Sequence, residues 1–413
     1  MRVQKCKGSR DFSPEEMTRF RLIEGIFRDC CRKWGYDEVR TPTLEYLHLF
    51  TSTGTLTPSL LGKVYSFLDW DGWSGERVVL RPDVTIPVAR LYIENMESKK
   101  LAKLFYVANV FIFEETGKET REKWQCGAEL IGGSSPLAEV ELIMLISEVL
   151  RKLGLESIEL KLSHAGLIRA LLVKLGLSPQ EQARIFDQIL DGNIEVLTRV
   201  KCESAELRKV LPLLLDLKGK SSGFLRNLGA MFDKSLPELK PGLEDFIKIV
   251  GLLEALGCKY QIDLASGKGF EYYAGVMFQL SDGEEKIGGG GRYDALIPLM
   301  GGKNIPASGF ALYIDRLMAL VKTKTQAKPS AKRILIRIEP GKPAMAKDGF
   351  NIANRLREAG YVAELDLGKQ QLASYKWALD IQKKTPQFVL TDLAKSKKFE
   401  AKTADEVLAL LSH

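Results

Sequence analysis

Hydrophobic and polar residues follow two spacings along the N-terminal part of the chain, and these predict a mixture of helices and strands. Apolar residues recur every three or four positions over residues 14–34, directly after Ser13, Pro14 and Glu16, a combination typical of a helix start. The other ranges with helical spacing are 84–96 and 136–155. The ranges that predict strands are 36–45, 64–83 (a hairpin), 101–115, 122–132 and 157–168.

The pattern changes near residue 165 and again near residue 259. Residues 165–255 show only helical spacing, so we predict a helical insertion without strands. Strand patterns return over residues 259–297, which include four consecutive glycines at 288–291. Residues 308–321 then predict a strand that runs into a helix.

Residues 322–332, KTKTQAKPSAK, have the composition of a linker. The segments after it alternate strand and helix, in the order 333–340, 344–361, 362–367, 372–384, 387–392 and 404–413. This alternation is typical of a compact α/β domain. We therefore predict an α+β protein with a body over residues 1–321, a helical insertion at about 165–255, a linker at 322–332 and an α/β domain over 333–413.

The net charge of +7 resides in the predicted C-terminal domain. Residues 321–413 carry 18 Lys and Arg against 10 Asp and Glu, a net charge of +8, which leaves −1 for the remaining chain. A basic domain favours an anionic partner, such as nucleic acid or an acidic protein surface. A solvated lysine-rich surface explains the same charge, because the lysines are not interleaved with aromatic residues that stack on bases.

Several classes of protein are excluded by what the sequence lacks. No stretch approaches the roughly 18–20 apolar residues of a membrane helix, and residues 1–17 lack the apolar core of a signal peptide. The six cysteines form no CxxC pair, and with only three histidines the chain shows no metal-ligand spacing. We therefore expect reduced thiols, a cytoplasmic protein without membrane contact, and neither a metal nor another cofactor.

Polar residues with possible chemistry concentrate in four short blocks. In chain order they are Arg81, Asp83, Thr85 and Arg90; Glu114, Arg121, Gln125 and Glu129; Lys268, Glu271, Tyr272 and Tyr273; and Arg292, Asp294 and Arg316. Gln125, Gly127 and Glu129 share one face of a strand, and the glycine leaves space for a ligand against the backbone. The glycines at 288–291 are expected to do the same on an adjacent strand.

Taken together, these blocks resemble histidyl-tRNA synthetase. The motifs that carry the resemblance are LRPDVT at 80–85, KGFEYY at 268–273, GGGRYDAL at 289–296 and DRL at 315–317, which resemble the family's LRPEGT, RGLDYY, GGGRYDGL and ERL. The resemblance implies a class II synthetase-like antiparallel sheet flanked by helices, usually in a homodimer. It also implies that the C-terminal domain is similar to an anticodon-binding domain.

The chain departs from the family pattern at two positions where the family has arginines that bind the nucleotide and the substrate carboxylate. Ile112 stands where the family has an arginine that holds the substrate carboxylate and the ATP α-phosphate, and Lys268 replaces a second arginine. Lysine keeps the charge but loses the planar bidentate fork. Such losses are tolerated in a sister family that the segment LRPDVTIPVAR resembles more closely, the regulatory subunit of ATP phosphoribosyltransferase.

This resemblance implies a non-catalytic subunit that activates a short-form catalytic phosphoribosyltransferase and passes L-histidine feedback to it. The residues implied to bind histidine are Asp83, Thr85, Gln125, Glu129, Lys268, Tyr272 and Tyr273. The implied remnants of a nucleotide site are Glu114, Arg121 and Arg316. A homodimer is expected, and tRNA is not expected as a partner.

Two alternatives stay open. One is a divergent histidyl-tRNA synthetase, which Arg316 and the basic C-terminal domain favour and which Ile112 and Lys268 oppose. The other is a synthetase paralogue with a different binding role. In either non-catalytic case we expect no histidyl-adenylate to form, because an electrostatic clamp on the reacting phosphate supplies much of the rate of such reactions.

Overall fold

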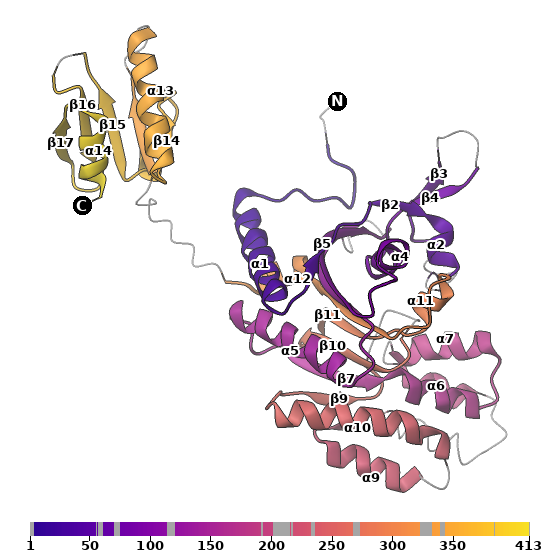
Figure 1. Ribbon diagram of the computed structural model, residues 1–413. Helices are drawn as coiled ribbons and strands as arrows, with labels where there is room; N and C mark the ends of the chain where they lie inside the picture. Colours follow the sequence, from indigo (N-terminus) through magenta and orange to yellow (C-terminus); the bar gives the residue numbers. More distant parts are fainter. Residues whose placement is uncertain are drawn as a thin grey trace. The chain divides into compact units, whose positions relative to one another are not determined.

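The computed structural model describes residues 4–54, 56, 61–69, 75–113, 120–190, 193–200, 215, 218–232, 236–266, 273–322, 333–338, 343–383 and 385–412. The chain divides into two compact units, residues 1–322 and 323–413. Figure 1 shows both units, with labels on most of their helices and strands. Of the predicted linker, only Lys322 belongs to the described residues.

A nine-stranded sheet forms the centre of the first unit, in the order β1-β5-β6-β12-β11-β10-β7-β9-β8. Its strands are β1 (Asp37–Glu38), β5 (Ala102–Phe111), β6 (Glu122–Ile131), β7 (Glu159–His164), β8 (Lys218–Gly219), β9 (Gln261–Asp263), β10 (Val276–Asp282), β11 (Glu285–Arg292) and β12 (Ala307–Tyr313). The six strands from β5 to β7 in this order are antiparallel. β1 pairs in parallel with β5, and β7 with β9. The sheet predicted as antiparallel is therefore mixed near its edges.

Helices surround this sheet, which confirms the predicted α+β class (Figure 1). They are α1 (Pro14–Lys33), α2 (Leu47–Thr51), α4 (Thr85–Asn95), α5 (Leu137–Lys152), α6 (Ala165–Lys174), α7 (Pro179–Leu190), α9 (Ser222–Phe232), α10 (Lys240–Ala255), α11 (Leu296–Leu299) and α12 (Ile314–Leu320), with 3-10 turns η1 (Ile194–Arg199) and η2 (Pro237–Leu239). Helix α1 begins with the predicted capping box, in which Ser13 and Glu16 exchange hydrogen bonds with each other's backbone N–H.

The two faces of β6 serve different purposes, because successive side chains of a strand point to opposite sides. Trp124 packs edge-on against Phe20 of α1, with 5.2 Å between ring centroids, and Cys126, Ala128 and Leu130 on the same face are buried in the core. Helices α1 and α12 contact β6. The opposite face carries Gln125, Gly127 and Glu129, so the two polar side chains of this strand segment point away from the core that α1 covers.

A second, three-stranded sheet, β2-β4-β3, precedes α4 in the chain. Its strands are β2 (Leu44–Tyr46), β3 (Ser66–Leu68) and β4 (Arg77–Leu80). β3 and β4 form the predicted hairpin, whose tip at 70–74 lies outside the described residues. The single strand predicted over 36–45 is wrong, because β1 and β2 belong to different sheets and Pro42, which lacks a backbone N–H, lies between them.

The helical insertion is helical in most of its described part but contributes one strand that its sequence pattern did not indicate. Residues Lys218–Gly219 form β8, which pairs with β9 at the edge of the large sheet. A two-residue strand is too short to leave a period-two pattern in the sequence. The insertion is therefore joined to the sheet by backbone hydrogen bonds as well as by its helices.

The second unit has a five-stranded sheet in the order β14-β13-β15-β16-β17. Its elements are β13 (Arg333–Arg337), α13 (Pro343–Glu358), β14 (Val362–Leu365), η3 (Leu372–Ser374), β15 (Trp377–Ile381), β16 (Phe388–Asp392), β17 (Lys397–Ala401) and α14 (Ala404–Leu411). The helix predicted at 372–384 is wrong, and β17 was missed. Four of the five β15 side chains are buried, so this central strand has no polar face, and its short apolar run does not distinguish strand from helix.

Candidate functional site

The polar face of β6 forms the floor of the candidate site. In the sheet register, Gln125 lies between Ala108 of β5 and Tyr313 of β12, and Glu129 lies between Leu104 and Gly309. Gln125 is buried, and Glu129 is completely inaccessible to solvent. A carboxyl group at such a position needs hydrogen-bond donors, because burial of an unpaired polar group is costly.

Hydroxyl groups from two other segments satisfy the Glu129 carboxyl group. Thr85, the first residue of α4, donates its hydroxyl to Glu129 Oε1 at 2.8 Å. Tyr293, which directly follows β11, donates its hydroxyl to Glu129 Oε2 at 2.5 Å. Three elements distant in sequence therefore meet at one buried carboxyl group, and two of the three residues are ones that the sequence predicted.

Asp83 and Tyr273 complete this group, which we call the Glu129 cluster: Asp83, Thr85, Glu129, Tyr273 and Tyr293. Asp83 accepts a hydrogen bond from the backbone N–H of Ile86 at 2.8 Å, at the first turn of α4. The buried Tyr273 ring lies against Gly291 of β11, at 3.0 Å from where a Cβ atom would be. Of the described residues predicted to bind histidine, Asp83, Thr85, Glu129 and Tyr273 lie in one group, and Gln125 is buried on the same strand without a contact to that group among those described.

Burial controls the protonation of the cluster. Desolvation raises the pKa of Glu129 to about 8, although the hydroxyls of Tyr293 and Thr85 act in the opposite direction and the nearby Asp83 charge adds to the rise. Desolvation also raises the pKa of Asp83 to about 6, against the lowering effect of backbone N–H groups at the start of α4. Burial and the neighbouring Glu129 raise the pKa of Tyr273 and Tyr293. The surroundings of Glu129 therefore favour its protonated form over its charged form.

The glycines of the site differ from the prediction of an open floor. A Cβ atom at Gly127 would overlap the Tyr106 hydroxyl group, so the space above this glycine is occupied by a side chain of the neighbouring strand. A Cβ atom at Gly309 would overlap Glu129 Oε2. Gly127 and Gly309 therefore make room for Tyr106 and for the Glu129 carboxyl group rather than directly for a ligand.

Arg81, which the sequence placed in the same motif as Asp83, has a structural role. Its buried guanidinium donates to the carbonyl oxygens of Thr41, Pro42 and Asn109 at 2.8–3.0 Å, and to the Asn109 side chain at 2.9 Å. These contacts tie the loop before β2 to β5. Arg81 thus fixes the backbone from which Asp83 and Thr85 extend, and its donors are directed at protein acceptors.

The predicted nucleotide-site remnants are not brought to the cluster by the described contacts. The Arg121 guanidinium lies over the Phe113 ring, 4.4 Å from its centroid, and its side chain packs against Gly8. Arg316 forms an ion pair with Glu285 of β11. Ile112 donates its backbone N–H to the Arg121 carbonyl at 2.9 Å, so residues 112 and 121 are neighbours across the hairpin. Glu114, Lys268, Glu271 and Tyr272 lie outside the described residues.

Tyr293 and Tyr106 are site residues that the sequence analysis did not select. Tyr293 lies inside the GGGRYDAL motif, between the two charged residues that were selected, so the motif itself was the available signal. Tyr106 is an aromatic residue of a strand pattern with no other distinguishing feature in the sequence. It lies at the site because β5 and β6 pair in a register that sets Tyr106 opposite Gly127. The charged neighbour Arg292 points elsewhere, to the completely buried Glu139 of α5 at 2.7 Å.

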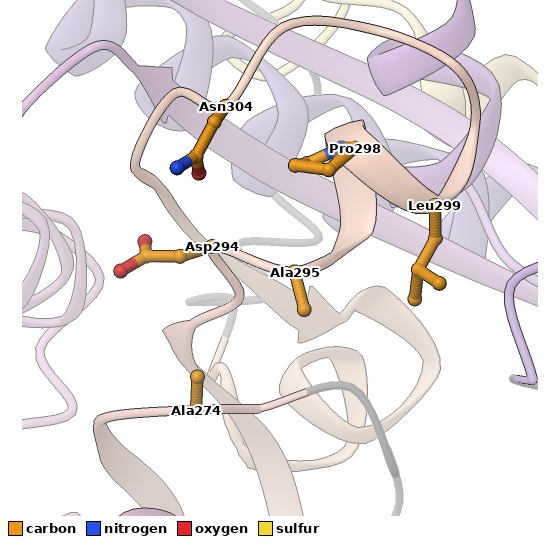
Figure 2. Close-up of a pocket in the computed structure, with 6 residues that line it drawn as sticks. All are labelled: Ala274, Asp294, Ala295, Pro298, Leu299 and Asn304. Atoms are coloured by element: carbon orange, nitrogen blue, oxygen red, sulfur yellow. The ribbon is translucent and has the colours of Figure 1, made fainter.

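A surface depression adjoins the residues that follow the two tyrosines. Figure 2 shows its lining, which is Ala274, Asp294, Ala295, Pro298, Leu299 and Asn304. Ala274 and Asp294 directly follow Tyr273 and Tyr293 in sequence. The lining has one carboxyl group and one amide among apolar side chains, so its chemistry is poorer than that of the Glu129 cluster.

The described residues show neither a cluster of metal ligands nor a membrane-spanning helix. No group of three or more His, Cys, Asp or Glu side chains in that part of the chain is placed to hold a metal ion. None of the described helices is long and apolar enough to cross a membrane.

Comparison with known proteins identifies relatives over nearly the whole chain. Residues 8–317 match the family described as histidyl-tRNA synthetase. The chain is 52% identical over 410 residues to the ATP phosphoribosyltransferase regulatory subunit of Dehalococcoides mccartyi, which covers 99% of this chain and 98% of the relative. It is 33% identical over 372 residues to the histidine–tRNA ligase of Methanosarcina acetivorans, which covers 86% of this chain and 83% of the relative.

A solved structure shows the same fold. It is described as an ATP phosphoribosyltransferase regulatory subunit/histidyl-tRNA synthetase from Bacillus halodurans, and it matches with a TM-score of 0.76 at 24% identity, over 92% of this chain and 98% of that chain. These findings confirm the resemblance drawn from the motifs. The higher identity to the regulatory subunit than to the ligase agrees with the departures at Ile112 and Lys268.

Proposed function

The chain belongs to the histidyl-tRNA synthetase family and, within it, to the ATP phosphoribosyltransferase regulatory subunits, and we propose from this premise that it activates a short-form catalytic phosphoribosyltransferase and conveys histidine feedback to it. The observation that carries the proposal is the 52% identity to a regulatory subunit over 99% of the chain. Ile112 stands where the synthetase family has an arginine that binds the substrate carboxylate and the ATP α-phosphate, which supports a subunit without aminoacylation activity of its own.

The Glu129 cluster supports histidine as the effector. Carboxylates hold an ammonium group or an imidazole N–H by charge-assisted hydrogen bonds, and tyrosine hydroxyls fix a ring. The described cluster supplies both kinds of group, from Asp83, Glu129, Tyr273 and Tyr293. Without an arginine at position 112 the histidine carboxylate lacks one partner, and one lost charged hydrogen bond costs about 1.5–3 kcal/mol, or roughly ten- to a hundredfold in affinity. We therefore expect weak histidine binding.

The experiment combines this chain with a short-form catalytic subunit and measures condensation of ATP with phosphoribosyl pyrophosphate. We expect activity to require both chains and to fall when histidine is added. Glu129→Gln is expected to lose histidine inhibition, because a neutral amide cannot hold the ammonium group by a charge-assisted hydrogen bond. Equal catalytic activity with and without this chain contradicts the proposal. Glu148→Gln, a carboxylate on α5 that pairs with Lys152 and Trp34 instead, is the matched control.

The alternative function is histidine–tRNA ligation, the activity named for the relative at 33% identity. Histidine-dependent exchange of pyrophosphate into ATP separates the two functions, because it requires adenylate formation. We expect no exchange. A rate near 1 s⁻¹, which is ordinary for an enzyme, favours the ligase.

A homodimer is part of the proposal. Leu44, Tyr46 and Phe67 on the three-stranded sheet are each at least 40% exposed, and contiguous exposed apolar side chains commonly mark interfaces. Tyr46, Val78 and Phe67 are aligned in register across the sheet, so these side chains share one face. Light scattering of the wild type and of Phe67→Lys tests this, since a dimer held by this face dissociates when a charge is placed on it. A monomeric wild type contradicts it.

A further inference from the structure

Among the described residues, Glu129 and Glu139 are both completely buried carboxyl groups, but Glu129 accepts hydrogen bonds from hydroxyl groups instead of pairing with a cation. Thr85 and Tyr293 donate one hydrogen bond to each of its oxygens. Glu139, which is equally buried, has Arg292 at 2.7 Å. A buried carboxylate without a paired cation is strongly penalised, so the stable form of such a group carries a proton.

The surroundings of Glu129 intensify this penalty. Among the described residues, the titratable groups that face it from the packed elements are Asp83 before α4, Tyr106 of β5, Tyr273 before β10 and Tyr293 after β11, and Tyr36 is a weaker neighbour. None of these groups carries a positive charge. Asp83 is a second carboxyl group, and its cationic neighbour Arg81, which donates its hydrogen bonds to Thr41, Pro42 and Asn109, lowers the pKa of Asp83 by less than desolvation raises it. Two interacting carboxyl groups that share a desolvated site lose their protons in separate steps, as a pair.

We propose that the Glu129 cluster holds one carboxyl proton when empty and releases it to solvent when the ammonium group of an α-amino acid enters, so that effector binding is a proton-for-cation exchange. This inference rests on the proposed function, in that it takes the cluster as the effector site. The geometry behind it is a completely buried carboxyl group, two hydroxyl donors on its oxygens and a second carboxyl group beside it.

The exchange balances in atoms and charge. The O–H bond of the Glu129 carboxyl group breaks and its proton passes to a solvent buffer base. The ligand ammonium group then donates N–H hydrogen bonds to the carboxylate that remains, and its positive charge replaces that of the lost proton. No covalent bond to the ligand forms. Thr85 and Tyr293 both donate to the carboxylate of the bound state. In the protonated state the oxygen that carries the proton donates it to the neighbouring hydroxyl oxygen, which then accepts instead of donating.

A proton-linked effector site makes the affinity depend on pH. Because the pKa of the empty site is raised to about 8, the protonated form predominates near pH 7, and every bound ligand then releases nearly one proton. Near pH 8.5 about a quarter of a proton is released, and the affinity is about eightfold higher than near pH 7. The feedback signal therefore strengthens as the pH rises.

The experiment is calorimetric titration of the full chain in phosphate and in Tris, whose heats of ionisation differ. The difference between the apparent binding enthalpies gives the number of protons released per ligand. The probes are L-histidine and histamine, which has the amine and the imidazole but no carboxylate. We expect both probes to release nearly one proton near pH 7, because the amine and not the carboxylate causes the release.

Two variants connect the released proton to Glu129. Tyr293→Phe removes a hydroxyl donor that lowers the pKa of Glu129, so proton release is expected to persist to higher pH than in the wild type. Glu129→Gln cannot release this proton, and any binding that remains is expected to be independent of the buffer. Glu148→Gln is the matched control: hydrogen bonds from Lys152 and Trp34 lower the pKa of this carboxylate, so its loss leaves proton release unchanged.

Two results overturn the inference in distinguishable ways. Histidine binding with the same apparent enthalpy in both buffers shows that Glu129 keeps its proton, and it refutes the exchange while the effector site stands. Absence of binding by either probe refutes both the exchange and the effector role of the cluster. Activation of the catalytic subunit is measured without histidine, so that part of the proposed function is tested separately.

Discussion

Gly309→Ala is the substitution that most directly tests whether the Glu129 cluster is built as described. The added methyl group would overlap Glu129 Oε2 and would lie 2.8 Å from the Ala128 carbonyl oxygen, which belongs to the neighbouring backbone and cannot move away. The Glu129 side chain must therefore leave its position. Its hydrogen bonds with Thr85 and Tyr293 are then lost.

The expected loss of stability follows from these contacts. Two buried hydrogen bonds contribute about 1 kcal/mol each, and overpacking of a dense site costs about 1–3 kcal/mol. We expect Gly309→Ala to lower the free energy of unfolding of the first unit by about 3–5 kcal/mol, a large part of the 5–15 kcal/mol typical of a folded domain. Histidine binding should be lost even where the variant remains folded.

The control is Gly25→Ala in α1. Gly25 is solvent-exposed within the helix, and a Cβ atom there has no neighbour within 4 Å. Alanine at such a position stabilises a helix by about 0.5–1 kcal/mol relative to glycine. Urea unfolding of both variants, followed by circular dichroism, gives the comparison. A Gly309→Ala protein as stable as the wild type would refute the placement of Glu129 against β12.

Four further outcomes are expected. Ile112→Arg raises the affinity for histidine by roughly ten- to a hundredfold and leaves that for histamine unchanged, because only histidine has the carboxylate that an arginine holds; calorimetry measures both. The ligand-free protein loses stability as the pH rises from about 4 to about 8. Burial raises the pKa of Asp83 to about 6 and that of Glu129 to about 8, above their values of about 4 in the unfolded chain, so the protonated carboxyl groups stabilise the fold. Urea midpoints measured between these pH values for the wild type and for Glu129→Gln check the sign. Arg81→Lys lowers the unfolding free energy by about 2–4 kcal/mol, because its buried acceptors lose donors. In a gel shift, the chain shows no preference for histidine tRNA at physiological salt, because lysines attract phosphates without reading bases.

The β5–β6 hairpin and its polar face could be predicted from the sequence because strand alternation is a local property. Residues 101–115 and 122–132 were predicted as strands, and β5 and β6 occupy Ala102–Phe111 and Glu122–Ile131. The face that carries Gln125 and Glu129 follows from the period of two alone. The prediction that Gly127 leaves its space to a ligand was wrong because Tyr106 fills that space, and which residue faces Gly127 depends on register.

In the second unit, too, tertiary structure decided what the local sequence pattern could not. Residues 377–381 form a strand with neighbours on both sides, β13 and β16, and burial of both faces removes the polar alternation that identifies a strand. The role of Arg81 was also beyond the sequence. Its motif suggested ligand chemistry, but its donors are directed at Thr41 and Pro42 of the loop before β2 and at Asn109 of β5, which are distant from Arg81 in sequence.

The proposed effector role of the Glu129 cluster accounts for an energetic cost that a remnant of a lost activity would have no reason to keep. In the absence of a ligand, the second carboxyl group beside Glu129 and the desolvation of both carry a cost that an apolar side chain of similar size would avoid. Ile112 shows that a polar position in the same hairpin can become apolar while the hairpin retains its pairing with residue 121. A cationic ligand offsets the cost at Glu129, because it supplies the positive charge that the described surroundings do not. Glu129→Met loses the two hydrogen bonds with Thr85 and Tyr293 but also removes a desolvated carboxyl group, so this variant should lose less stability than Gly309→Ala while histidine binding is abolished; an equal or larger loss of stability would indicate a purely structural Glu129.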